Sequence, residues 1–170
     1  MSVTKIEYNG YVNVEYEKEG KILTSYRIHN TGCNALFDYL TKCLSLEAKS
    51  SECPGYIMLY YNNGILSENN LGVPVLNNVL YRSKVKTVLE NDEYVVQFRF
   101  IIPSNSLIDT TGNVLAIYSE ENKFTAIQES NLRKPSAYVK LIDNNLIQNL
   151  GPNINILIDW YMSFTNGGNN

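Results

Sequence analysis

Charged residues are scarce in this chain. They make up 18% of its 170 residues, against 44% that are hydrophobic, and the formal net charge is only −3. A nucleic-acid-binding protein is not expected, because it needs clusters of Lys and Arg to neutralise phosphates. Asparagine and tyrosine take the place of charge, with 23 Asn and 13 Tyr in the chain. This composition favours turns and contact surfaces over long helices.

Cysteine is also scarce, and its number is odd. The three cysteines stand ten residues apart at Cys33, Cys43 and Cys53, whereas a secreted disulfide scaffold normally pairs all of its cysteines. The pattern therefore predicts reduced thiols in a protein made in a cytoplasm. The first residues, "MSVTKIEYNG", carry no apolar leader, and no hydrophobic run reaches membrane-spanning length. We expect a protein that stays soluble where it is made unless an assembly carries it elsewhere.

Sequence motifs for catalysis are missing as well. The chain has no glycine-rich phosphate loop, no G-x-S-x-G and no H-E-x-x-H. The stretch nearest to chemistry is "HNTGCNALFDYLTKC" (29–43), which holds the single histidine, His29, and places Cys33 near the start of an expected helix. A helix N-terminus can lower a thiol pKa, but "CNA" matches no local signature of a Cys hydrolase. We interpret His29 as a turn residue and Cys33 as a small packed residue.

Metal and carboxylate sites are the remaining chemical candidates. A structural zinc site would have to use His29, Cys33, Cys43 and Cys53, whose spacing lacks the short ligand pairs typical of zinc folds. Acidic residues gather in "EYEKE" and in the turn "ENDE", without a calcium-loop pattern, and such residues are usually exposed. They are Glu15, Glu17, Glu19, Glu90, Asp92 and Glu93. We therefore predict no catalytic, cofactor-binding or metal-binding residue, and no enzyme.

Strand patterns dominate the chain. Alternating apolar residues predict two hairpins, the first with Gly20 in its turn, and "NVLAIYS" followed by "KFTAIQE" predicts a third. "YIMLYY" is apolar on both faces, which is typical of a central strand. The expected strands comprise residues 11–17, 22–28, 56–61, 79–88, 94–102, 113–119, 123–129, 136–142 and 154–164.

One helix is expected among these strands. "NALFDYLTKCLSL" places an apolar stripe at helical spacing, and Thr31 or Asn34 could cap its start. With no internal repeat, linker or low-complexity block, the pattern predicts a single-domain antiparallel β-sandwich, with a distorted barrel, jelly-roll or Ig-like arrangement as alternatives. The amphipathic helix lies near residues 33–46. We expect the domain to comprise residues 1–166 and residues 167–170 to be a disordered tail.

The aromatic residues have two possible uses. On a sheet they could bind a carbohydrate, or they could divide between the core and a protein interface. Trp160 and Tyr161 are neighbours on one expected strand, so they point to opposite sides. We expect Trp160 in the core and the terminal strand in the centre of its sheet. The residues considered are Tyr60, Tyr61, Tyr81, Tyr94, Trp160 and Tyr161.

The order of these parts resembles that of small virion proteins of crAss-like tailed bacteriophages. The resemblance lies in a strand leading into "HN-x-G", read here in "RIHNTG", then one helix, then "CPGYIMLYY", and a final strand with "W-x-x-F-x-N", read here in "WYMSFTN". It implies an auxiliary capsid protein, for decoration or for the base of a head fibre, that binds the capsid shell in the virion after synthesis in the host cytoplasm. The alternative is a carbohydrate- or host-surface-binding module of a phage fibre.

The resemblance also implies the partners. They are the major capsid protein or other virion proteins, with further copies of the chain as an additional possibility. No nucleic acid, membrane or cofactor is expected, and the resemblance gives no catalytic residue.

Overall fold

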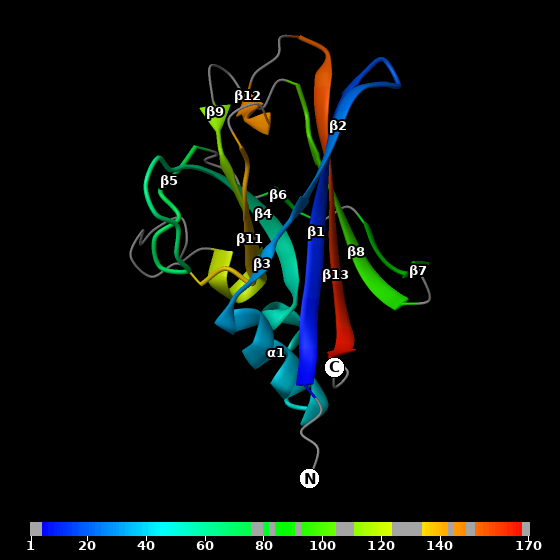
Figure 1. The fold of residues 1–170 in the computed structure, drawn as a ribbon, viewed down its shortest axis with the longest axis vertical. Coiled ribbons are helices and arrows are strands. Elements are labelled where there is room, and N and C mark those ends of the chain that lie inside the picture. Colours follow the sequence, from blue (N-terminus) through cyan, green and yellow to red (C-terminus); the bar gives the residue numbers. More distant parts are fainter. Residues whose placement is uncertain are drawn as a thin grey trace.

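The protein is a β-sandwich with one principal helix beside it. The computed structural model describes residues 5–75, 80–81, 84–90, 93–104, 111–123, 134–142, 145–148 and 152–167. Two antiparallel sheets face each other, and α1 (Asn34–Leu44) lies beside the start of β1 and the end of β13 (Figure 1). Within the described residues the sheets do not close into a barrel. The predicted fold class, a β-sandwich with one amphipathic helix, is confirmed.

The first sheet contains five strands in the order β2-β1-β13-β8-β7. The strands are β1 (Lys5–Lys18), β2 (Lys21–His29), β7 (Lys84–Glu90), β8 (Glu93–Ile102) and β13 (Ile154–Gly167). Two predicted hairpins are confirmed, as β1–β2 and β7–β8. The terminal strand is central, as predicted, because β13 pairs with β1 on one side and with β8 on the other. Gly167 pairs with Lys5, so the strand continues into the expected tail, whose residues 168–170 lie outside the described part.

The turn between β1 and β2 explains why this hairpin could be predicted from the sequence. Glu19 and Gly20 both have positive φ, 54° and 79°. Two left-handed residues in succession are what a type I′ turn requires, and its twist matches that of the flanking strands. The Gly20 amide donates a hydrogen bond to the Glu17 carboxylate, which fixes the turn from within the strand.

The second sheet is built around β4 and β10. Its order is β3-β11-β10-β4-β5, with β6 also paired to β4. The strands are β3 (Thr31–Gly32), β4 (Pro54–Tyr61), β5 (Val73–Pro74), β6 (Leu80–Tyr81), β10 (Val114–Ser119) and β11 (Ala137–Lys140). A separate small pair joins β9 (Thr111–Gly112) to β12 (Ile147–Gln148). The central position predicted for "YIMLYY" is confirmed, because β4 has neighbours on both sides.

The third predicted hairpin is wrong. Both edges of β10 are already paired, one with β4 and the other with β11. The chain after β10 turns into a short helical segment at residues 120–123, and residues 124–129 lie outside the described part. The apolar pattern of 113–119 has another cause: β10 is buried on both faces, so it reads as a continuous apolar run.

Two apolar clusters hold the layers together. The larger one fills the space between the sheets with inward side chains of β1, β8 and β13 against those of β4, β10 and β11. Trp160 lies in it with no exposed surface, as predicted. The smaller cluster covers the far face of the second sheet, where Leu71 and Leu66 of the loop after β4 pack on Met58 and Tyr118. The second sheet is therefore covered on both faces, whereas the outer face of the first sheet, away from the core, is more open.

Candidate functional site: a polar pocket beside the helix

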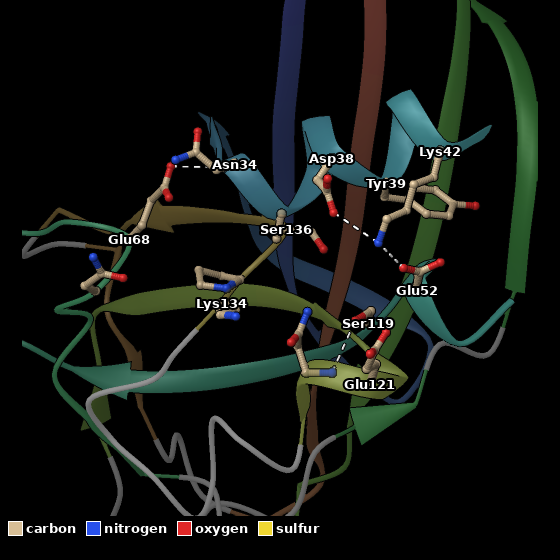
Figure 2. A pocket seen from close by; sticks show the side chains of 14 residues that line it. Asn34, Asp38, Tyr39, Lys42, Glu52, Glu68, Ser119, Glu121, Lys134 and Ser136 are labelled. Atoms are coloured by element: carbon tan, nitrogen blue, oxygen red, sulfur yellow. Dashed lines mark hydrogen bonds and ion pairs between the residues drawn. The ribbon is translucent and has the colours of Figure 1, made fainter. Parts of the chain in front are cut away.

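A pocket of about 450 Å³ opens beside α1 (Figure 2). Its walls come from four places far apart in the sequence: α1, the loop after β4, the helical segment 120–123, and residues 134–136 before β11. Glu52 of the 3-10 turn η1 (Ser50–Glu52) completes the rim. The volume is within the usual range for small-molecule pockets, about 300–1,000 Å³, but most such pockets are apolar. This one is lined mainly by charged residues, amides and hydroxyls.

The start of α1 is held by the loop that forms one wall. The residue at the N-cap position is Cys33, and its side chain makes no capping hydrogen bond. The Asn34 amide instead donates to Glu68 Oε1 at 3.1 Å. The predicted caps, Thr31 and Asn34, are therefore wrong, because Thr31 belongs to β3 and Asn34 is already inside the helix. A carboxylate at this position also interacts favourably with the helix dipole.

The opposite wall is held by Lys42. Its ammonium group pairs with Asp38 at 3.2 Å, one helical turn earlier, and with Glu52 of η1. The hydrogen bond to Glu52 raises the pKa of Lys42, and the same bond lowers the pKa of Glu52. The Lys49 amide donates to Glu52 at 2.8 Å as well. The Lys42–Glu52 ion pair links η1 to α1, and the Lys42–Asp38 pair lies within the helix.

The inner wall contains two buried serines. Ser119 ends β10, and its hydroxyl oxygen accepts a hydrogen bond from the Asn122 amide at 3.3 Å. Ser136 is 3% exposed, and its backbone is fixed on both sides: its amide donates to Ile117 O at 2.8 Å, and its carbonyl accepts from the Cys33 amide at 2.9 Å. Within the described part of the chain, its hydroxyl has no hydrogen-bond partner.

The pocket is negatively charged. The described residues that line it include four carboxylates and two ammonium groups, which together carry a net charge of −2. Figure 2 shows carboxylates on more than one side of it. Glu68 bonds only the Asn34 amide among the described residues, and Glu121 is exposed without an ion-pair partner there. The charged residues are Asp38, Glu52, Glu68, Glu121, Lys42 and Lys134.

The candidate nucleophile of the sequence is unsuited to that role. Cys33 is 1% exposed, and burial, with a contribution from Glu68, raises its pKa to about 12. A nucleophilic cysteine needs the opposite shift, because the thiolate is the reactive form. Cys33 is a packed residue, as predicted, and His29 is exposed at the end of β2.

The other two cysteines lie beside Tyr39. Burial raises the pKa of Tyr39, and the neighbouring Cys53 and Cys43 raise it further. All three cysteines are reduced. Among the described residues, no group of three His, Cys, Asp or Glu side chains is arranged to hold a metal ion.

The acidic residues of "EYEKE" lie in the first hairpin, in β1 and in the turn that follows it. Glu17 accepts hydrogen bonds from Asn155 Nδ2 at 2.9 Å and from the Gly20 amide, and these hydrogen bonds lower its pKa. Its role is to tie the β1–β2 turn to β13. The side chains of "ENDE", which include Glu90, Asp92 and Glu93, lie outside the described part.

The outer face of the first sheet is an ordered surface of a different kind. Tyr161 points away from the core, opposite to Trp160 as predicted, and stacks on Tyr11 with ring centroids 4.4 Å apart. The Arg27 guanidinium lies 4.2 Å from the centre of the Tyr11 ring. Since β1 lies between β2 and β13, Arg27 and Tyr161 cover the Tyr11 ring from opposite sides.

Charged and amide side chains continue this face onto β8. Arg99 forms a two-pronged ion pair with Asp159, at 2.7 and 2.6 Å. Gln97 Nε2 donates to the Tyr161 hydroxyl at 3.0 Å. Side chains of four strands are thus fixed to one another on this face.

The remaining aromatic residues considered in the sequence lie in different parts of the structure. Tyr60 is buried, with its hydroxyl 2.8 Å from that of Tyr118, and Tyr61 is 49% exposed. The side chains of Tyr81 and Tyr94 lie outside the described part. The aromatic residues do not gather into one platform among the described side chains.

Sequence reasoning missed the pocket. Glu68, Glu121 and Ser136 lie in connecting segments, where no periodicity marks them. The helix start gave no signal either, because Thr31 and Asn34 both looked like suitable capping residues in the sequence.

Comparison with known proteins adds no family to this description. No family model, curated protein or solved structure matches the chain. In the part of the chain that is described, no helix is both long and apolar enough to cross a membrane.

Proposed function

We propose that the protein is a structural component of a bacteriophage virion, an auxiliary capsid protein that binds the head shell. The starting point is the resemblance to small virion proteins of crAss-like phages, which depends on two motifs far apart in the chain. "HN-x-G" comprises His29, Asn30 and Gly32, and "W-x-x-F-x-N" comprises Trp160, Phe164 and Asn166.

The observation that carries the proposal is that these two motifs meet. The Asn30 amide hydrogen-bonds the Tyr8 hydroxyl. The Asn30 side-chain amide can be oriented so that its nitrogen faces an acceptor and its oxygen faces donors. In that orientation, the oxygen accepts a hydrogen bond from Trp160 Nε1 at 3.0 Å. The Tyr8 ring lies 5.5 Å from that of Phe164 and packs against Gly32. One network thus joins both motifs, which supports treating the resemblance as one shared structural feature.

The outer face of the first sheet supports a docking role. Its stacked tyrosines and its Arg99–Asp159 pair are fixed in the free protein. Surfaces rich in Tyr and Arg are typical of protein interfaces. A surface that is already ordered also loses less side-chain entropy on binding.

A carbohydrate-binding module is the weaker alternative. Sugars stack on open aromatic faces, and the Tyr11 ring is covered by Arg27 on one side and Tyr161 on the other. Tyr61 is exposed, but it pairs with Val73 at the edge of the second sheet and not with another aromatic residue.

Quantitative mass spectrometry of purified particles tests the proposal. A shell-bound auxiliary protein should be present at a fixed copy number relative to the major capsid protein, and it should remain after nuclease treatment and a salt wash. Absence from the particles, or a trace amount that varies between preparations, would overturn the proposal.

A further inference from the structure

We infer that the pocket beside α1 binds one cationic side chain, a lysine or an arginine, presented by a protein partner. The inference deepens the proposed docking role and rests on it only for the source of the cation, a neighbouring virion protein. The chemistry of the pocket itself comes from Glu68, Glu121, Ser136 and the Lys42 ion pairs.

The first argument is charge complementarity. Lys42 neutralises part of the Asp38 and Glu52 charge through its two ion pairs, so these three groups together retain one negative charge. Glu68 and Glu121 add two more, and among the described lining residues the one further cation is the exposed Lys134. An anionic ligand would meet an excess of carboxylates, whereas a cation would be attracted.

The second argument is the hydroxyl of Ser136. Buried polar groups are almost always hydrogen-bonded, and one left without a partner costs free energy. Ser136 lines the pocket (Figure 2) and is 3% exposed, and its hydroxyl has no partner among the described residues. An incoming ammonium or guanidinium N–H can donate to this oxygen, so the hydroxyl points to a ligand that supplies donors.

The third argument excludes neutral occupants. An apolar group would remove water from the carboxylates without replacing its hydrogen bonds, which is unfavourable. A sugar binds best on stacked aromatic faces, and Tyr39 is the single aromatic residue among the described residues that line the pocket. A volume of about 450 Å³ accommodates one long side chain together with part of its backbone.

The pocket is also built to keep its shape. Glu68 attaches the loop wall to the start of α1, and Lys42 attaches η1 to the same helix. Ser136 is fixed by its backbone to β10 and to Cys33. A cation would therefore enter a site in which Glu68, Asp38 and Glu52 are already held in position.

Titration of the full-length protein with small probes tests this inference. N-acetyl-arginine amide and N-acetyl-lysine amide should bind with millimolar Kd, as measured by NMR shifts of α1 and Ser136 amides, and binding should weaken with salt. N-acetyl-norleucine amide, which keeps the stem without the charge, and N-acetylglucosamine should not shift these amides. Equal binding of the neutral probes would overturn the inference.

Variants identify the groups involved. Glu121→Gln and Glu68→Gln should each weaken arginine-amide binding about fivefold, in line with partly exposed ion pairs. Glu68→Gln keeps an oxygen for the Asn34 amide, so α1 remains capped. Glu47→Gln is the matched control, because Glu47 is exposed beyond the end of α1 and outside the pocket. Unchanged affinity in both pocket variants would contradict the inference.

Ser136→Ala separates a binding role from a structural one. Its hydroxyl has no partner within the described chain, so the variant should keep or slightly raise the melting temperature while weakening arginine-amide binding. A lower melting temperature with unchanged affinity for the arginine amide would show a structural hydroxyl and contradict the inference.

The two proposals fail separately. Protein present in purified particles but unable to bind either cationic probe removes this inference and leaves the virion role. Protein that binds the probes but is absent from particles retains the site and removes the virion role.

Discussion

At the scale of single residues, Trp160 joins the core to a polar network. Its ring has no exposed surface, and its Nε1 donates to Asn30, which also bonds Tyr8. The polar network of Asn30 and Tyr8 therefore lies directly against the buried core. This double role makes Trp160 the most informative residue to change.

Trp160→Ala should lower the free energy of unfolding by about 3–5 kcal/mol, as for other buried large aromatic residues. Urea denaturation followed by circular dichroism measures this loss. Trp160→Phe keeps most of the apolar volume but removes the donor to Asn30, so it should cost less. A loss below about 1 kcal/mol for the alanine variant would place the ring outside the core.

Gly10 provides the space for the same network. A Cβ at this position would overlap with the Tyr8 hydroxyl and with the Asn30 side chain, both of which lie against its Cα. A glycine inside a strand often marks such a close approach.

Gly10→Ala should therefore destabilise the protein by about 1–3 kcal/mol, the usual cost of overpacking. Gly64→Ala is the matched control, because a Cβ there would make only an ordinary contact at 3.5 Å with Asn62 Oδ1. Thermal unfolding of both variants measures the difference. An equal melting temperature for the two variants would show that Tyr8 can move aside at little cost.

At the scale of elements, α1 depends on a residue 34 positions away from its first turn. The helix begins without a capping side chain of its own, and Glu68 provides the acceptor for the Asn34 amide. The loop after β4 is thus attached to the helix as well as to the far face of the second sheet through Leu71.

Glu68→Ala should lower the free energy of unfolding by about 1 kcal/mol, the typical value for loss of an N-terminal cap. Glu68→Gln should cost less, because its amide oxygen still accepts the hydrogen bond. Hydrogen exchange of the Asn34 amide gives the local readout and should speed up in the alanine variant alone. No change in that amide would mean that Glu68 does not cap the helix in solution.

The elements also show what could be predicted from the sequence. The hairpin β1–β2 and the central β13 were predictable, because one buried face imposes alternation on each strand. The alternation of apolar and polar residues could not predict the neighbours of β10. This strand is buried on both faces, so its sequence is apolar throughout and does not indicate which strands pair with it. The pocket was not predictable, since Glu68, Glu121 and Ser136 come together only when three connecting segments pack around α1.

At the scale of the whole molecule, one thiol and two tyrosine hydroxyls are buried in or around the core. Each of these groups is neutral when protonated and becomes negatively charged when it loses its proton. Burial raises the pKa of the Cys33 thiol from 9.0 to about 12 and that of Tyr16 from 10.0 to about 12. It also raises the pKa of Tyr8, close to Trp160. Folding therefore favours the protonated form of all three groups.

This burial predicts that stability falls at alkaline pH. Between the ordinary and the raised pKa, the unfolded chain has released protons that the folded chain retains, so a rise in pH favours unfolding. The contribution of these groups should be complete below about pH 9 and lost as the pH approaches 12. Melting temperatures measured from pH 7 to 11 should be level at first and then decline. Cys33→Ala should reduce the steepness of the decline, whereas Tyr61→Phe, which changes an exposed tyrosine, should not. A decline that is equally steep in the Cys33→Ala variant would show that the Cys33 thiol is not a source of the alkaline sensitivity.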